Sequence, residues 1–235
     1  MNDVMKVYKF LYSCYGPQGW WPLASHKGVN PTKTGSSSGY HPGDYSFPRN
    51  DSERFEICVG AVLTQNTSWA QTEKAIRNLK SIGALTPLSM RGIDEKKLCK
   101  AIRPAGYFNQ KAKKLRLFSD FYINLDGKVP SRDELLSVWG IGEETADSML
   151  LYAFNVPTFV VDAYTKRVFS NLGLVDRDAG YDEVKGFFEK GIRKDLVVYQ
   201  EYHALLVEHA KRFYGRGSDF ALCPVYKDVL KIKKH

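Results

Sequence analysis

The chain has 235 residues, enough to bury a hydrophobic core in one large or two small domains. Apolar residues make up 43% of it, which excludes a disordered polar chain, and no apolar run reaches the ~18 residues that a membrane span needs. The formal net charge of +8 favours DNA or RNA as a partner, because binding to phosphates releases counterions. Charge alone does not decide this, since many basic proteins bind no nucleic acid.

Helical periodicity dominates the chain and predicts an all-α fold. Apolar residues at helical spacing predict a first helix over 3–15, which the Gly- and Pro-rich sequence GPQGWWP ends. The segment 25–50 is rich in Gly, Ser and Pro and has no apolar period. We expect a long loop there, either mobile or ordered as a lid near a site.

The remainder of the chain predicts consecutive helices from residue 52 onwards. Later helices begin near Asp162 and Tyr181, and a longer one runs from Leu196 to Phe213. The basic stretch 111–116 keeps apolar residues at helical spacing, so we interpret it as a solvated helix face that adds phosphate contacts. The basic end of the chain is expected to fray.

Cysteine and histidine spacing argues against a metal site. The four cysteines are Cys14, Cys58, Cys99 and Cys223. None forms a CxxC pair, which excludes a zinc ribbon or a cluster held by clustered thiolates. His203 and His209 are six residues apart on one predicted helix and so face different sides, whereas a helical metal pair needs i,i+4 spacing. The N-terminus does not resemble a secretory signal, so we expect a cytoplasmic, nucleoid-associated protein.

A Gly-x-Gly turn joins two predicted helices in the sequence LLSVWGIGEETADSMLLYAF. The backbone amides of Gly140, Ile141 and Gly142 would form an anion nest at the start of the second helix. Such a nest suits one DNA phosphate and reads no base sequence. Thr145, in the same helix, is assigned to the same DNA contact. An ordinary helical hairpin also favours glycine at its turn, so this segment alone leaves DNA binding open.

Asp162 stands between an apolar run and a predicted helix in PTFVVDAYTKRV. A role as helix N-cap explains it without any chemistry. The helix dipole would also keep this carboxylate ionised, and an ionised carboxylate in a cleft stabilises the oxocarbenium-like sugar of glycosidic cleavage. Asp162 is therefore the candidate catalytic residue, and Lys166, one turn further on, is a candidate phosphate contact.

Three of the four tryptophans fall in two turns, as Trp20 and Trp21 in GWWP and as Trp69 after TQNTS. Core packing is one interpretation. The other is a pocket for a base swung out of the duplex, in which indoles would favour a cationic alkylated purine. Gln65 and Asn66, at a junction between helix and turn, either cap helices or fill the gap that an extruded base leaves.

The order of hairpin, spacer and VVD segment carries a family resemblance. Residues 136–168 resemble the signature of the helix-hairpin-helix (HhH-GPD) DNA glycosylase superfamily related to endonuclease III, and residues 55–67 and 102–116 resemble its helical-barrel domain. The resemblance implies two helical lobes with an active-site cleft between them and the helix-hairpin-helix motif at its edge. It also implies that Asp162 is the catalytic aspartate.

The same resemblance implies a division of the chain. Its parts are an N-terminal helix and WWP segment (1–24) that belong to the terminal lobe, a loop insertion (25–51), a helical-barrel lobe ending in the hairpin (52–155), a terminal helical lobe carrying the aspartate (156–225) and a basic tail (226–235).

Two positions depart from the bifunctional members of this family. The lysine with which those members attack the sugar is replaced by Glu144, which cannot form an imine, so we expect no lyase step. Lys166, on another helix, is a remote substitute. The region matching the iron–sulfur motif keeps only Cys223, so no cluster or other cofactor is expected. Whether a monovalent cation sits in the hairpin turn stays open.

The combination of WWP, LTQNT, RPAGYFNQKAK, GIGEETA and VVD resembles the 3-methyladenine glycosylases of the endonuclease III class and their archaeal endonuclease III-related cousins. In that group an aromatic pocket would be lined here by Trp20, Trp21, Pro22 and Trp69. Arg216 falls where that group can carry a lysine near the pocket, and no role is assigned to it.

The expected function is a monofunctional glycosylase. It flips alkylated purines such as 3-methyladenine out of double-stranded DNA and excises them in base excision repair, as a monomer. Three alternatives stay open: excision of deaminated or mismatched bases (uracil, hypoxanthine, thymine in G:T), a bifunctional glycosylase/AP lyase, and a non-catalytic DNA-binding module.

Overall fold

The computed structural model describes residues 1–32, 38–215 and 222–229, and these ranges contain helices and loops without a β-strand. The predicted all-α fold class is confirmed. The α-helices are α1 (Asp3–Tyr15), α2 (Asp51–Leu63), α3 (Trp69–Ser81), α4 (Pro87–Gly92), α5 (Glu95–Ile102), α6 (Phe108–Asn124), α7 (Arg132–Ser137), α8 (Glu143–Ser148), α9 (Ala163–Asn171), α10 (Tyr181–Gly191) and α11 (Leu196–Phe213). A 3₁₀ turn and two π-helical segments complete them: η1 (Arg103–Ala105), η2 (Met149–Ala153) and η4 (Val225–Val229). Within the described ranges, none of these helices has the length and apolar character to span a bilayer.

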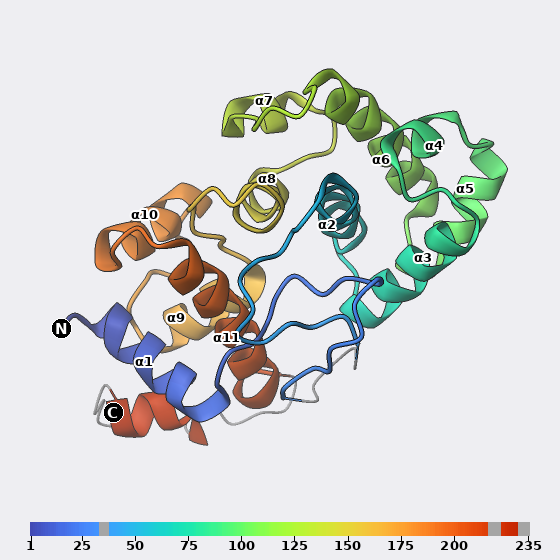
Figure 1. The fold of residues 1–235 in the computed structure, drawn as a ribbon. Helices are drawn as coiled ribbons and strands as arrows, with labels where there is room; N and C mark the ends of the chain where they lie inside the picture. Colours follow the sequence, from blue (N-terminus) through green and yellow to red (C-terminus); the bar gives the residue numbers. More distant parts are fainter. Residues whose placement is uncertain (33–37, 216–221, 230–235) are drawn as a thin grey trace.

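The helices gather in two groups (Figure 1). In the first, α4 packs against α6 and α3 packs against α5. In the second, α11 packs against α9, and α1 packs against α11 and α10, so the first helix of the chain joins elements from its last third. Helix α2 and η2 contact each other between the two groups. This arrangement has the two helical lobes that the sequence analysis predicts.

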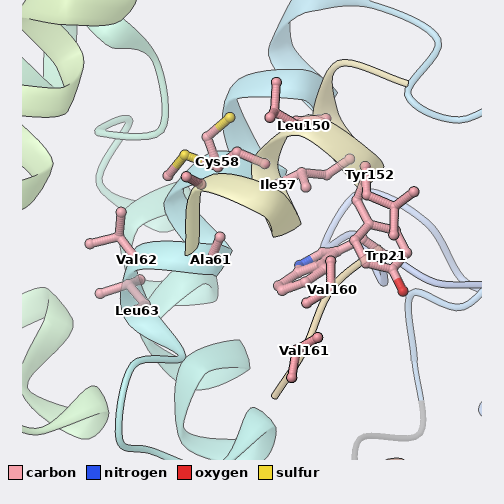
Figure 2. Close-up of a cluster of buried hydrophobic side chains, with 14 of the residues drawn as sticks. Trp21, Ile57, Cys58, Ala61, Val62, Leu63, Leu150, Tyr152, Val160 and Val161 are labelled. Atoms are coloured by element: carbon pink, nitrogen blue, oxygen red, sulfur yellow. The ribbon is translucent and has the colours of Figure 1, made fainter. Parts of the chain in front are cut away.

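A continuous core connects the groups through α2, whose residues from Phe55 to Leu63 are all buried. Figure 2 shows Trp21 beside Tyr152 of η2, next to Val160 on the strand-like segment before α9. The ring centroids of Trp21 and Tyr152 lie 5.3 Å apart. A Cβ atom on Gly60 would lie 2.8 Å from Trp21 Nε1, so glycine at this position lets the indole contact the backbone of α2.

The described parts of the 25–50 insertion, residues 25–32 and 38–50, form a loop that lies against the WWP segment. The loop folds back on the WWP segment, where His41 N donates to Gly19 O at 3.1 Å and His41 Nε2 lies 3.1 Å from Trp21 O. Within the loop, Tyr40 N donates to Gly28 O at 3.2 Å. A Cβ atom on Gly28 would lie 1.6 Å from Tyr40 O, so glycine is required for this close approach. The insertion therefore braces the tryptophan segment.

The interpretation of 111–116 as a solvated face is wrong for Lys111, which is 2% exposed. Its ammonium donates to Leu63 O at 2.9 Å and to Ala105 O at 2.8 Å, and so caps one carbonyl at the end of α2 and one at the end of η1. Burial, with a smaller contribution from Lys114, lowers the pKa of Lys111 to about 8. Lys111 thus holds the end of α2 in place. Sequence spacing did not reveal this, because the two acceptors come from other elements.

The end of the chain is helical over η4, where the sequence analysis expected fraying. Arg216 and the last six residues of the predicted basic tail lie outside the described residues.

Candidate active site

A cavity of about 540 Å³ lies between the two groups of helices, within the size range of small-molecule sites. The four residues predicted as an aromatic pocket all line it, and so does the predicted catalytic aspartate: Trp20, Trp21, Pro22, Trp69 and Asp162. They come from the WWP segment, the start of α3 and the N-terminus of α9. The fold therefore assembles in one place what the sequence distributes over more than 140 residues.

The indole rings form edge-to-face pairs along the wall of this cavity. The centroids of Trp21 and Trp69 lie 5.4 Å apart at an interplanar angle of 85°, and those of Trp20 and Trp21 lie 6.0 Å apart at 77°. Trp21 is 7% exposed and is part of the core, whereas Trp20 and Trp69 are half-buried. The tryptophans thus pack into the core and also line the cavity. Tyr40 of the insertion lines the same cavity and was not predicted.

Asp162 is both a helix cap and a cavity residue. Its Oδ1 accepts a hydrogen bond from Thr165 N at 2.7 Å, the N-cap contact of α9. Its Oδ2 lies 3.5 Å from Nε2 of His203. Burial raises the pKa of Asp162, but His203 and the Thr165 amide outweigh it and hold the pKa below the ordinary value. The carboxylate is therefore ionised although the residue is only 9% exposed.

His203 is the site residue that sequence reasoning missed. Its Nδ1 lies 2.8 Å from the hydroxyl of Tyr152, and this hydroxyl donates to Gln200 O at 3.0 Å. Because the hydroxyl has one hydrogen, it accepts from an Nδ1–H of His203. Nε2 faces the carboxylate of Asp162, and this contact lowers the pKa of Asp162. We infer that His203 positions Asp162.

The second histidine of α11 lies on another face, as its spacing predicts. His209 is buried between Tyr15, whose hydroxyl lies 2.9 Å from Nδ1, and Cys223, whose sulfur lies 3.0 Å from Nε2. These contacts join α1, α11 and the segment before η4. Among the described residues, no three His, Cys, Asp or Glu side chains are grouped so that they could hold a metal ion.

Glu144, where the family resemblance expects the lysine of bifunctional members, lines the cavity on the first turn of α8. The residue as a whole is exposed to solvent. Shielding of its carboxyl group and the charge of Asp162 raise its pKa to about 7, against a lowering effect of His203. The cavity thus holds two carboxyl groups whose pKa values are displaced in opposite directions.

The two hairpin glycines have different backbone conformations. Gly140 has φ +84°, and an added Cβ would lie 2.6 Å from the side chain of Lys114. Gly142 has φ −101° and is the N-cap of α8, so its backbone is open to other residues. The amide of Ile141 donates to Val138 O at 3.0 Å and its side chain is buried, so this amide is not uncovered as predicted.

Gln65 lines the cavity with its amide group engaged on both sides. Nε2 donates to Gly140 O at 3.1 Å and to Thr145 Oγ1 at 2.9 Å, and Oε1 accepts from the ammonium of Lys114. A side chain held in this way is poorly placed to enter the duplex. Asn66 is exposed, does not line the cavity and has φ +53°, so it is the freer member of the predicted pair.

Two of the predicted DNA contacts are engaged within the protein. Thr145 is buried, and its hydroxyl faces Gln65 and the cavity. The ammonium of Lys166 donates to Ala179 O at 2.8 Å. By contrast, Trp139, which the sequence analysis left unassigned, is 50% exposed beside Gly140, with Lys113 Nζ 4.3 Å from its ring centroid. Its position directly before the Gly-x-Gly turn could have identified Trp139 as a candidate DNA contact from the sequence.

Removing the imidazole of His203 should raise the pKa of Asp162, because the contact that lowers this pKa is lost. In His203→Gln, burial then acts against the Thr165 amide alone, so the pKa of Asp162 rises. Carboxyl-carbon NMR titration of Asp162 measures this change. His209→Gln, a matched change on the same helix, should leave the titration of Asp162 unaltered. An Asp162 that titrates identically in His203→Gln and in the unmodified chain would disprove the positioning role.

Comparison with known proteins places this site in a family. Residues 59–194 match the model of the HhH-GPD superfamily of base excision DNA repair proteins, over more than half of the chain. A Methanocaldococcus jannaschii protein named as a candidate DNA repair glycosylase is 42% identical over 233 residues, which cover 94% of this chain and 93% of the relative.

Solved structures agree with this assignment. The H. pylori 3-methyladenine DNA glycosylase MagIII, bound to 1,N6-ethenoadenine, superimposes with a TM-score of 0.68 at 28% identity, over 90% of this chain and 98% of that one. Endonuclease III in a non-covalent complex with DNA superimposes with a TM-score of 0.67 at 25% identity, over 76% and 83%. The chain therefore belongs to the HhH-GPD superfamily of base excision DNA repair proteins.

Proposed function

We propose that the chain is a monofunctional DNA glycosylase that receives a damaged base in the tryptophan-lined cavity and cleaves its bond to the sugar, acting best on alkylated purines such as 3-methyladenine. The observation that carries the proposal is the convergence of Asp162 and the three tryptophans on one cavity beside the hairpin. The similarity to MagIII, which is named for 3-methyladenine and was solved with an adenine derivative, supports the choice of substrate.

The walls of the cavity suit a flat, positively charged base. Trp20 and Trp69 present half-buried indoles, whose π-faces attract cations. The ionised Asp162 adds a full negative charge at the inner wall. An alkylated purine that already carries a positive charge needs no proton to leave, so binding by these groups also favours its release.

Asp162 would act where positive charge develops. As the bond between C1′ and the base breaks, the sugar becomes an oxocarbenium-like cation, which a nearby carboxylate stabilises strongly in a site shielded from water. A water molecule then adds to C1′. The reaction needs side chains and water alone, so the prediction that no cofactor takes part is retained as part of the proposal.

DNA would lie across the mouth of the cavity, with the hairpin on the backbone. The N-terminus of α8 begins at Gly142 and presents backbone N–H groups to a phosphate. Exposed Trp139 and Lys113 extend this face, and Asn66 takes the place of Gln65 as the residue facing the gap in the duplex. A monovalent cation in the hairpin turn stays a prediction.

The substitution Asp162→Asn should separate binding from catalysis. Asparagine also caps helices, so α9 and the fold are retained. Base release from 3-methyladenine DNA should fall by about 10²-fold or more, because the charge opposite the sugar cation is lost, while affinity for the same duplex stays within a few-fold. Single-turnover release and a binding titration measure the two effects. Unchanged release would refute the assignment, and a wild-type chain that releases no damaged base would leave a DNA-binding module.

A bifunctional lyase is the second candidate, and Lys211 is the observation that favours it. This lysine lines the cavity, and shielding of its ammonium lowers its pKa, which leaves a larger share of the nucleophilic amine than a lysine with an ordinary pKa has. Lys166 does not line the cavity and its ammonium is bonded to Ala179 O. Lys211 projects from α11, so it does not take the place of the lysine that Glu144 replaces.

Borohydride trapping decides between the two candidates. We expect no covalent adduct between the chain and damaged DNA under conditions in which endonuclease III is trapped, and an intact strand after base release. An adduct that disappears in Lys211→Arg would instead show that the chain is a lyase with a relocated nucleophile.

A further inference from the structure

The cavity contains a second carboxyl group that the proposed cleavage of cationic bases does not use. Glu144 lines the cavity together with Asp162, from the first turn of α8. In the ranges that the structure describes, no hydrogen bond or ion pair engages its carboxyl group, although its backbone carbonyl accepts from Ser148 Oγ at 2.7 Å. This carboxyl group is therefore available to a molecule bound in the cavity.

The environments of the two carboxyl groups favour opposite protonation states, one ionised and one protonated. Asp162 receives an N–H bond from Thr165 and faces His203, so it is held ionised. Glu144 has no such donor, and shielding together with the charge of Asp162 raises its pKa to about 7. Pairs of carboxyl groups held in opposite protonation states divide acid and base roles in glycosidic cleavage.

Other titratable groups that face Glu144 come from three helices. His203 and Lys211 of α11 line the cavity, as does Tyr164 of α9, and Tyr181 of α10 interacts with Glu144 electrostatically. His203 opposes the upward displacement of the Glu144 pKa, and burial raises the pKa of Tyr181, so that Tyr181 stays neutral around pH 7. Between about pH 6 and pH 8, Glu144 is therefore the carboxyl group of the cavity that changes protonation.

We propose that Glu144 is a general acid that protonates the departing base, so that the cavity excises neutral damaged purines as well as cationic ones. This inference rests on the proposed glycosylase function and extends it to a second substrate class. A neutral purine is a poor leaving group, because it would depart as an anion, whereas protonation at a ring nitrogen lets it leave as a neutral molecule.

The step balances within the cavity. The bond between C1′ and the base breaks and its electron pair goes to the base, which takes the proton of Glu144 at a ring nitrogen. Water adds its oxygen to C1′ and gives up one proton, which returns to the Glu144 carboxylate. Asp162 stabilises the sugar cation throughout and ends the cycle unchanged. A cationic alkylated purine needs no proton from Glu144, because the electron pair of the broken bond neutralises its positive charge.

Glu144→Gln tests the proposal, because glutamine keeps the shape of the side chain and cannot donate a proton in this way. Single-turnover base release is measured between about pH 5.5 and pH 9, on duplexes containing hypoxanthine or 1,N6-ethenoadenine (neutral) and 3-methyladenine (cationic). For the wild type, release of neutral bases should fall about tenfold per pH unit above about pH 7, while release of cationic bases stays level. The substitution should lower neutral release by about 10²-fold or more and abolish its alkaline decline, leaving cationic release within about threefold.

Glu143→Gln is the matched control. Glu143 precedes Glu144 on α8, lies outside the cavity lining and faces Arg132 at 3.9 Å, so its substitution should change neither rate. The proposal is overturned if Glu144→Gln lowers both classes of release equally, if it leaves neutral release unchanged, or if the wild type releases cationic purines and no neutral ones. Failure of the glycosylase function itself looks different, since the wild type then releases neither class.

Discussion

The candidate active site depends on the carboxylate of Asp162, which both caps a helix and lines the cavity. Asp162 caps α9 through the Thr165 amide and reaches the cavity with its other oxygen, beside His203. Burying an unpaired carboxylate costs more free energy than a domain can spare, so these two partners allow Asp162 to remain ionised although it is buried. The contact with His203 lowers the pKa of Asp162 more than the cap contact with Thr165 does.

The tryptophans that line the cavity also belong to, or pack against, the hydrophobic core, so the same contacts stabilise the fold and shape the site. Trp21 packs against α2 at Gly60 and against Tyr152, so the ring that shapes the cavity is also part of the core. The insertion braces this segment from outside through His41. A rigid wall made of core residues holds its shape before a base arrives, which favours discrimination by fit and by charge over adaptation to many ligands.

Local sequence patterns predicted the helices, the Asp162 cap and the tryptophan cluster, because each depends on neighbours within a few residues or on a recognisable motif. They did not predict His203, whose importance arises from contacts with Asp162 and Tyr152, at least 41 residues distant in the chain. Lys111 was misjudged for the same reason, since helical spacing cannot reveal acceptors on other elements. Gln65 was assigned to the duplex because its bonds to the hairpin form only in the folded chain.

The central claim is that Asp162 faces the sugar of an extruded nucleotide. A crystal structure with duplex DNA carrying a cationic pyrrolidine analogue of the abasic sugar tests it most directly, because the ring nitrogen mimics the charge that develops at C1′. We predict this nitrogen about 3 Å from an Asp162 carboxylate oxygen, with the indole-lined cavity open beside it. A pyrrolidine ring stacked within the duplex, or bound outside the cavity and away from Asp162, would contradict the account.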